Sequence, residues 1–550
     1  MTARPHAVTA TERWEQPMSD TVVNATYSQQ AAHLVARVDR DRWGSVRPSL
    51  YETARVISAA PWLPGEPGRI AYLLNEQAPD GSWGEGPERY RLLPTLSAVE
   101  AALAVLRRGA MPEETTRRLA TAVDRGLAAL RALPPAGPWP DTAAAEILVP
   151  GLVARINEQL PLIADDKTRV IDGWRPGPGL ALPRGYDQAV PEYAAKRYVS
   201  AGSLPVKLHH TFEGIAGYIP GALIPDRPDL LGSSPAATAA RAARVPASPA
   251  AETVAALESV ARRYAGSFPE AAPILVFERL WVAAALARAN LPAASLPTVR
   301  RWAADIYDPR GVRGAPGLMT DADDTAMAVL VSSLVGLPHS PEPLDLFHNG
   351  SHYDCYIGED TGSITANAHA LQALGDYQRR HPETRHIYAP RTNKLRDWLI
   401  GRQRPEGTWP DKWHASPYYA TARCVSALRQ YGEDHAAAAV EAAVAWAVDT
   451  QRDDGSWGVW GGTAEETAYA AQILLSTAER QPRHDRALHR AETYLNGGTS
   501  TGHHPALWHD KTLYAPGAMI EAEVLAVREL LRTRDGRPGR ETNTPTDAER

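Results

Sequence analysis

One turn pattern occurs three times in the chain and limits the folds it can adopt. A Gln is followed four residues later by a Gly and two residues after that by a Trp, in the segments Gln77–Gly84, Gln403–Trp409 and Gln451–Gly458. Two of these turns start 48 residues apart (451 minus 403). In each turn Asp-Gly or Glu-Gly supplies a tight bend, and the Trp ring can fold back onto the Gln amide. Repeated turns of one kind indicate repeated helical hairpins.

The segments around these turns have a helical hydrophobic pattern. Apolar residues recur every three or four positions, which predicts amphipathic helices. Short Pro- and Gly-rich turns separate them, and no run of alternating β-branched residues predicts a sheet. We therefore predict an almost entirely α-helical fold. The clearest helical segments are Thr95 to Leu106, Ala143 to Leu160, Val254 to Tyr264, Thr325 to Leu337, Ala420 to Tyr431 and Thr463 to Leu475.

Length and composition restrict the class of protein. A chain of 550 residues is too long for one ordinary core, and the usual size of about 150 residues per domain suggests two to four. Hydrophobic residues make up 44%, charged residues 22%, and the formal net charge is -6. This is a soluble globular composition, and no basic region suggests binding to nucleic acid.

Targeting signals also bear on the class. The first twenty residues contain Arg4, Glu12, Arg13 and Glu15 and no apolar stretch of signal-peptide length. The longest apolar runs fall well short of the about 18 residues of a transmembrane helix. Two cysteines are too few for a disulfide scaffold or a cysteine-rich zinc site, which fits a reducing compartment. We expect a cytoplasmic protein without a transmembrane segment.

An acidic cluster is the strongest chemical signal. Asp321, Asp323 and Asp324 place three carboxylates within four positions, directly before an apolar helical run. Thr320 or Asp321 can cap that helix, and a helix start attracts negative charge, so a purely structural role would account for the pattern. Neighbouring carboxylates also crowd their charges, however, so one of them can retain a proton. The cluster is therefore a candidate Brønsted acid.

Several further segments occur in the order found in one enzyme family. The acidic cluster resembles the Asp-Xaa-Asp-Asp-Thr-Ala signature of class II terpene cyclases, and the Gln-to-Trp turns resemble their QW repeats. Matches to class II diterpene cyclases run from about Ser49 to Tyr469. The matching segments are Ser49–Ala54, Gln77–Gly84, Glu146–Pro150, Leu208–Gly214, Gly232–Ala239, Phe277–Trp281 and Asp321–Ala326.

The resemblance implies an architecture. Such cyclases are all-α proteins built from two α/α-barrel domains, with the active site between them. It implies a β domain formed by residues 25–45 and 292–533, which carries the acidic cluster, and an inserted γ domain formed by residues 46–291. Residues 1–24 and the polar tail 534–550 are expected to be disordered.

The resemblance also implies an acid. Asp323 matches the proton donor, and Asp321 and Asp324 would tune it by charge or by relaying a proton from water. His369 matches the polar partner of this acid, a position that plant diterpene cyclases usually fill with Asn. An imidazolium would stabilise the Asp anion left after proton transfer. The alternative is that His369 is a satisfied structural residue on an amphipathic helix.

A second set of matches concerns the end of the reaction. His210 matches a His that, in plant enzymes making *ent*-copalyl diphosphate, holds a deprotonating water together with an Asn. The Asn position falls on Glu270. His210 and Glu270 could still position such a water. Alternatively Glu270 is a surface residue beside Pro269, and the terminating base lies elsewhere.

A third set concerns the diphosphate. Glu213 matches a position implicated in binding Mg²⁺ and diphosphate, and Lys207 lies shortly before it. A hard cation between carboxylate and phosphate oxygens is chemically sensible. The alternative is an exposed Glu-Lys pair. The segment Asp165-Asp166-Lys167-Thr168-Arg169 lacks the final Asp of the class I metal motif.

These observations predict an isomerase (intramolecular lyase) that protonates geranylgeranyl diphosphate and forms a bicyclic copalyl-type diphosphate, with the *ent* isomer favoured. An isoprenoid diphosphate is then the substrate, and a class I terpene synthase would use the product. The alternatives are another labdane or clerodane diphosphate, or drimenyl diphosphate from farnesyl diphosphate. The alternative outside the enzymes is a non-enzymatic α/α-barrel binding protein.

Overall fold

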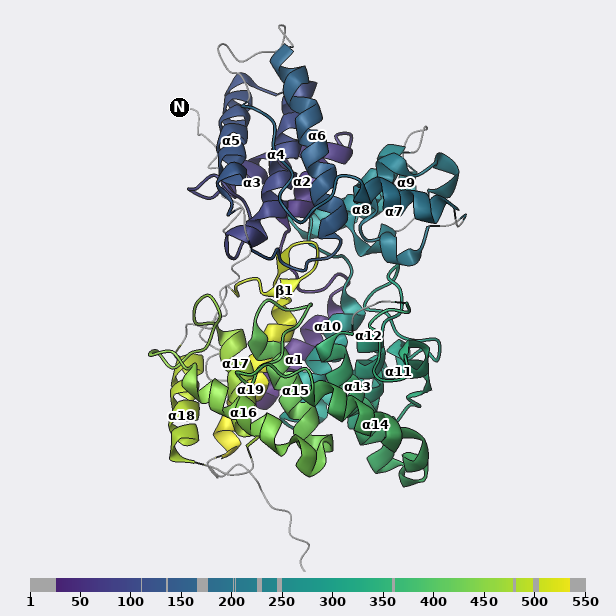
Figure 1. The fold of residues 1–550 in the computed structure, drawn as a ribbon, viewed down its shortest axis with the longest axis vertical. Coiled ribbons are helices and arrows are strands. Elements are labelled where there is room, and N and C mark those ends of the chain that lie inside the picture. Colours follow the sequence, from purple (N-terminus) through teal and green to yellow (C-terminus); the bar gives the residue numbers. More distant parts are fainter. Residues whose placement is uncertain are drawn as a thin grey trace, which may run out of the picture.

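The computed structural model describes residues 26–109, 111–134, 137–165, 177–200, 202, 204–224, 230–244, 250–358, 362–477, 481–497 and 504–534. The segments 1–24 and 534–550, for which the sequence predicts disorder, lie outside these residues apart from Arg534, the last residue of a helix. Two helical lobes meet at a narrow waist (Figure 1). The predicted all-helical fold is confirmed.

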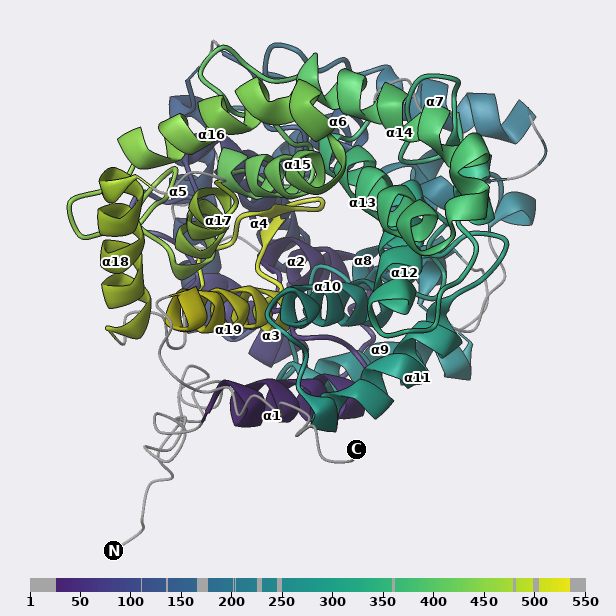
Figure 2. The same ribbon diagram turned by 90° about the horizontal axis from the view of Figure 1, so that it is seen from below.

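The lower lobe is an α/α barrel. Its inner ring closes through the neighbouring pairs α10–α12, α12–α13, α13–α15, α15–α17, α17–α19 and α19–α10, and the remaining helices lie outside it (Figure 2). One continuous hydrophobic core fills this lobe. Its helices are α1 (Tyr27–Arg40), α10 (Leu275–Arg288), α11 (Leu296–Ile306), α12 (Ala322–Leu334), α13 (Ile364–Arg380), α14 (Arg385–Ile400), α15 (Pro417–Tyr431), α16 (Ala437–Asp449), α17 (Ala464–Leu475), α18 (Pro482–Asn496) and α19 (Gly517–Arg534).

The upper lobe is a second, smaller helical ring. Helices α2, α4, α6 and α8, with the short turn Phe212–Gly214, contact one another in a closed circuit, and three hydrophobic clusters fill the lobe. Its helices are α2 (Leu50–Ala59), α3 (Glu66–Asn75), α4 (Leu92–Arg108), α5 (Glu113–Ala132), α6 (Ala145–Asp165), α7 (Val190–Ser200), α8 (Pro235–Arg244) and α9 (Ala251–Arg263).

The three repeated turns have the same geometry. Each Trp is fully buried, and its ring N–H donates to a main-chain carbonyl ten residues earlier at 2.7 to 2.8 Å. Each Gln amide donates to the Gly carbonyl of its own turn and to a carbonyl of the next outer helix. Each Gly has a positive φ, and a Cβ there would lie 2.5 to 2.7 Å from a main-chain oxygen. Each turn therefore leads from an outer helix to an inner helix, and its Gln hydrogen-bonds to the next outer helix.

Helix α10 lies in a different lobe from the one that the sequence analysis assigns to it. The expected γ domain, residues 46–291, includes α10, but this helix packs between α12 and α19 in the lower core. Its residues Leu280 to Leu286 are almost all fully buried there. The inserted segment therefore ends before Leu275. The Leu291-Pro292 turn, the predicted boundary, only connects two helices of the lower lobe.

A short hairpin is the other departure from the expected fold. Strands β1 (Trp508–His509) and β2 (Leu513–Tyr514) pair antiparallel and lie at the waist (Figure 1). Strands of two residues are too short to show an alternating pattern, so periodicity could not predict them.

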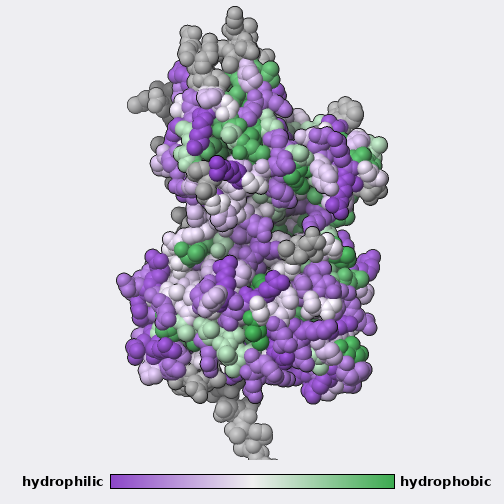
Figure 3. Space-filling model, in the orientation of Figure 1, coloured by the Kyte–Doolittle hydropathy of each residue, from purple (hydrophilic) through white to green (hydrophobic). Residues whose placement is uncertain are grey.

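The visible face of the molecule is largely hydrophilic, with small scattered apolar patches (Figure 3). Among the described residues, no helix is long and apolar enough to cross a membrane.

Candidate active site

A cavity of about 430 Å³ lies between the lobes and contains the predicted acid. Asp321, Asp323 and Asp324 lie in its wall, at the start of α12 in the lower lobe. His210, Lys207 and Glu270 line it from the inserted segment. The cavity therefore joins two groups of polar residues that are far apart in the sequence.

The start of α12 positions the acid. Asp321 is the N-cap, and its carboxylate accepts the backbone N–H of Asp324 at 2.7 Å. The predicted capping role of Asp321 is therefore confirmed, and its role in the acid stays a prediction. Asp323 points to α13, where the Nδ1 of His369 lies 2.6 Å from its Oδ1. His369 is 2% exposed and Asp323 is 14% exposed, so the imidazole is sealed while the carboxyl faces the cavity.

Three carboxyl groups near Asp323 have raised pKa values. Burial, together with the charge of Asp323, raises the pKa of Asp321 to about 7, although the hydrogen bonds from Asp324 act to lower it. Burial and the Asp321 charge raise the pKa of Asp324 well above its usual value. Burial and the charge of Asp323 also raise the pKa of Asp411 to about 7. Carboxyl groups crowded in a dry site therefore share protons at neutral pH.

Aromatic rings form the wall beside the acid. Trp281 stands edge-on to His369, with ring centroids 5.5 Å apart at 89°, and its ring N–H donates to the hydroxyl of Tyr419 at 2.9 Å. Trp508 packs on Tyr419 at 4.7 Å. Phe277 lies 4.3 Å from Trp281. These rings all line the cavity, and the faces of such rings attract cations.

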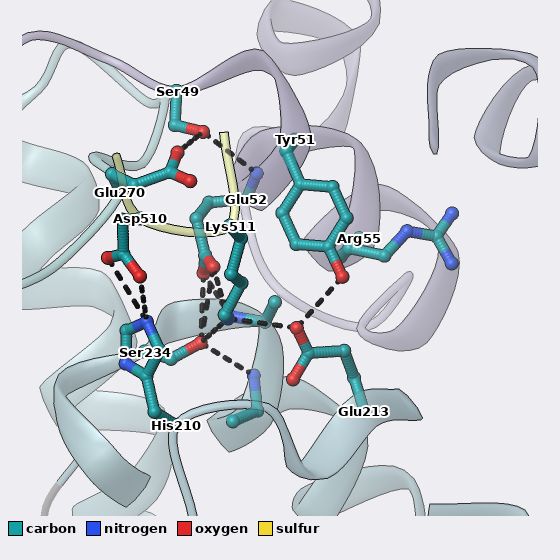
Figure 4. Close-up of polar contacts among 12 residues, drawn as sticks. Ser49, Tyr51, Glu52, Arg55, His210, Glu213, Ser234, Glu270, Asp510 and Lys511 are labelled. Carbon is teal, nitrogen blue, oxygen red and sulfur yellow. Dashed lines mark hydrogen bonds and ion pairs between the residues drawn. The ribbon is translucent and has the colours of Figure 1, made fainter. Parts of the chain in front are cut away.

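Another part of the cavity wall is formed by Asp510, in the turn of the β1–β2 hairpin (Figure 4). His210 Nε2 lies 2.9 and 3.1 Å from the two carboxylate oxygens of Asp510, and its Nδ1 lies 2.7 Å from the carbonyl of Gly232. Burial lowers the pKa of His210, but Asp510 outweighs this effect and raises it overall. Burial likewise opposes ionisation of Asp510, but His210 lowers its pKa overall.

Glu270 is buried beside this pair and makes other contacts. It accepts the backbone N–H of Thr512 at 2.6 Å and a hydrogen bond from Ser49. It is 1% exposed. Burial and the Asp510 charge raise its pKa to about 7. Glu270 is therefore not a surface residue, and no hydrogen bond joins it to His210 among the contacts of the described residues.

Lys511, next in the hairpin turn, is fully buried in the upper lobe. Its Nζ donates to Glu52 at 2.6 Å, Glu213 at 2.8 Å and Ser234 at 2.7 Å, as Figure 4 shows. Burial lowers the pKa of Lys511, but Glu213 and Glu52 raise it overall. The Tyr51 hydroxyl also donates to Glu213 at 2.9 Å. One ammonium thus bridges two buried carboxylates.

Comparison with known proteins agrees with this geometry. The family described as squalene-hopene cyclase C-terminal domain matches residues 352–494. A copalyl diphosphate synthase of Streptomyces anulatus is 80% identical over 550 residues, which cover 100% of both chains. A copalyl diphosphate synthase of Streptomyces cyslabdanicus is 55% identical, over 92% of this chain and 96% of the relative.

The chain belongs to the class II diterpene cyclases. A solved structure supports this assignment: the ent-copalyl diphosphate synthase from Streptomyces platensis has a TM-score of 0.83 and 38% identity, and the match covers 92% of this chain and 100% of that one. For a cyclase, a proton-holding carboxyl cluster at one end of an aromatic-lined cavity is the expected starting point of the reaction.

The site brings together some of the predicted residues and separates others. Asp323 and His369 are in contact, as the resemblance implies. His210 and Glu270 are expected to hold one water together. In the structure each contacts a different residue of the hairpin turn: His210 contacts Asp510, and Glu270 contacts Thr512. The alternative that Glu213 belongs to an exposed Glu-Lys pair is wrong, because Glu213 is buried and accepts a hydrogen bond from Lys511.

Sequence reasoning missed the hairpin residues. Asp510 and Lys511 lie between Trp508 and Tyr514, and a pair of opposite charges between large aromatic residues is the one local signal that could have indicated a buried ion pair. Asp411 was also missed. It receives a hydrogen bond from Thr365, which lies one helical turn before His369.

The contacts of Glu213 do not fit a magnesium ligand. Its Oε1 is occupied by Lys511 and Tyr51, and an ammonium at 2.8 Å repels a second cation. Its Oε2 is buried without a hydrogen-bond partner, so one oxygen remains. Among the described residues, no group of three or more His, Cys, Asp or Glu side chains could hold a metal ion.

Proposed function

We propose that this cyclase protonates geranylgeranyl diphosphate and releases copalyl diphosphate, with the diphosphate retained. The observation that carries the proposal is the contact of Asp323 with His369 at the end of a cavity walled by Trp281, Tyr419 and Trp508. Asp323 gives its proton to the terminal alkene, and the electron pair of that alkene forms the new C–H bond. His369 then stabilises the carboxylate that remains.

Two lysines support the placement of the diphosphate. Lys207 from the upper lobe and Lys412 from the lower lobe both line the cavity. Their ammonium groups lie over the rings of Tyr356 and Trp413, at 5.3 and 4.8 Å from the ring centroids. Ammonium groups from both lobes can bind phosphate oxygens while the isoprenoid tail reaches towards Asp323. A Mg²⁺ ion bound by the diphosphate itself remains a prediction, independent of Glu213.

The ent preference rests on a water shared by His210 and Glu270, which stays a prediction; in the structure His210 contacts Asp510 and Glu270 contacts Thr512. The relatives at 80% and 55% identity are named copalyl diphosphate synthase without the prefix, whereas the *ent* enzyme with a solved structure is 38% identical. We therefore propose copalyl diphosphate of the series opposite to *ent*. We also propose that a class I terpene synthase uses it in the cytoplasm.

The test is incubation of the purified protein with geranylgeranyl, farnesyl and squalene substrates, with and without Mg²⁺. We expect a bicyclic alcohol from geranylgeranyl diphosphate, in the organic extract only after phosphatase treatment, and chiral chromatography against both copalol enantiomers assigns the series. A hydrocarbon formed with release of pyrophosphate would contradict the proposal. A main product from farnesyl diphosphate would favour the drimenyl alternative.

A further inference from the structure

The hydrogen bonds of His210 define its proton state. Both ring nitrogens face acceptors: Nδ1 faces the Gly232 carbonyl at 2.7 Å, and Nε2 faces the Asp510 carboxylate at 2.9 Å. A carbonyl oxygen only accepts, so Nδ1 must carry a proton. When Asp510 is ionised, Nε2 must carry one as well. His210 is then an imidazolium paired with a carboxylate, and it has no free lone pair with which to act as a base.

The two carboxylates of this wall differ in access. The Asp510 side chain is 19% exposed and lines the cavity. Glu270 also contributes to the wall, but it is 1% exposed and its oxygens accept bonds from Ser49 and Thr512. His210 favours the ionised form of Asp510. Asp510 is therefore the carboxylate that a carbocation in the cavity can reach in its basic form.

The position of Asp510 is well defined by its own backbone. Its N–H donates to the Thr512 carbonyl at 3.0 Å within the hairpin turn, and its carbonyl accepts the N–H of Ala143 from the upper lobe at 2.9 Å. The carboxylate is thus held between the lobes, in the wall of the cavity that Asp323 also lines.

We propose that Asp510, oriented by His210, is the base that ends the cyclisation. The proposal rests on the proposed function, because it needs a carbocation formed at Asp323. One Asp510 oxygen removes a proton from a carbon next to the cationic centre, and the electron pair of the broken C–H bond forms the alkene. The proton becomes the O–H of Asp510, next to the imidazolium, and passes to solvent when the product leaves.

The test compares the products of wild type, Asp510→Asn and Asp510→Glu with geranylgeranyl diphosphate, after phosphatase treatment, by gas chromatography and mass spectrometry. An amide cannot accept the proton, so in Asp510→Asn we expect hydroxylated or rearranged cyclic products to replace the deprotonated alkene as the main product. Asp510→Glu keeps a carboxylate and should keep the alkene as the main product. Circular dichroism verifies folding, and Asp510→Ser takes the place of Asp510→Asn if that variant is unfolded.

Glu270→Gln is the matched control, because it makes the same change in the neighbouring carboxylate. We expect it to keep the wild-type product profile. An unchanged profile in folded Asp510→Asn would overturn the proposal, as would a redirected profile in Glu270→Gln alone. Equal redirection in Asp510→Asn and Asp510→Glu would assign a structural role instead. If wild type forms no cyclic diphosphate, it is the proposed function that fails, before any variant is compared.

Discussion

Two clusters of carboxyl groups, one at the start of α12 (the acid end) and one around the hairpin turn (the hairpin end), differ in their partners. At the acid end, Asp321, Asp323 and Asp324 have one imidazole among them. At the hairpin end, the carboxylates of Asp510, Glu52 and Glu213 are paired with His210 and Lys511. The first group therefore has too few cations, whereas each carboxylate of the second has a cation within hydrogen-bond distance.

The difference shows that burial alone does not decide the proton state of a carboxyl group. Burial acts to raise the pKa of Asp324 and of Asp510 alike. The partner then determines the outcome. Asp324, whose neighbours are carboxylates, has a strongly raised pKa, whereas Asp510, facing an imidazolium, has a lowered one. A proton donor and a base can therefore lie in one cavity without exchanging roles.

Removing the acid should have the largest effect. Asp323→Asn keeps the shape of the side chain but has no acidic proton, so we expect turnover to fall by about 10⁴-fold, the upper end of the general-acid contribution. The measurement is single-turnover formation of cyclic product, with circular dichroism to verify folding. Retained turnover in the folded variant would remove Asp323 as the donor and break the comparison between the two ends.

Removing the Lys511 ammonium at the hairpin end should lower the free energy of unfolding. Lys511→Met leaves Glu52 and Glu213 buried without a counter-ion, which typically costs about 3 to 5 kcal/mol. The free energy of unfolding from denaturant titration measures this loss. Lys207→Met is the matched control, because Lys207 is exposed and its loss should cost less than about 0.5 kcal/mol. Equal stability of the two variants would show that the buried bridge contributes nothing.

The smallest effect expected is a pH dependence. Asp321 has a pKa of about 7, above the usual value of about 3.9, so the folded state binds its proton more tightly than the unfolded state does. The stability from this proton is full below about pH 4 and is lost as pH rises through 7. Turnover should fall over the same range near pH 7, as the cluster loses its shared proton.

The charge of Lys511, whose pKa is raised, should not change near pH 7. Burial also raises the pKa of Glu270 to about 7. A rate profile from pH 6 to 9 for wild type and Glu270→Gln therefore distinguishes titration of the acid cluster from titration of Glu270. Loss of the alkaline limb in Glu270→Gln would place the titrating group at the hairpin end instead.

Local patterns predicted most of the fold. The helical periodicity located α4, α6, α9, α12, α15 and α17, and the Gln-to-Trp turns predicted the repeated helical hairpins. The γ-domain boundary was wrong because a turn such as Leu291-Pro292 marks the end of a helix, not the core into which that helix packs. Long-range packing placed α10 with α12 and α19.

The site was predictable at one end only. Asp321, Asp323 and Asp324 are adjacent in the sequence, and His369 follows on the next inner helix, so local order was enough to group them. Lys511 and Glu52 are separated by 459 residues, and no local pattern pairs charges over such a distance. Glu213 was therefore interpreted as a metal ligand when its cation comes from the protein itself.

The burial of Lys511 has a consequence for the order in which the molecule can be completed. Glu52 and Glu213 belong to a lobe whose helices have all left the ribosome long before residue 511, yet its interior lacks its only bridging ammonium among the described contacts until then. Likewise α1, near the start of the chain, packs on α19, near its end. During synthesis from the N-terminus, neither lobe can therefore form all its contacts before the last segment is made. The nascent chain must hold two partly assembled halves in a soluble state until its last segment locks both at once.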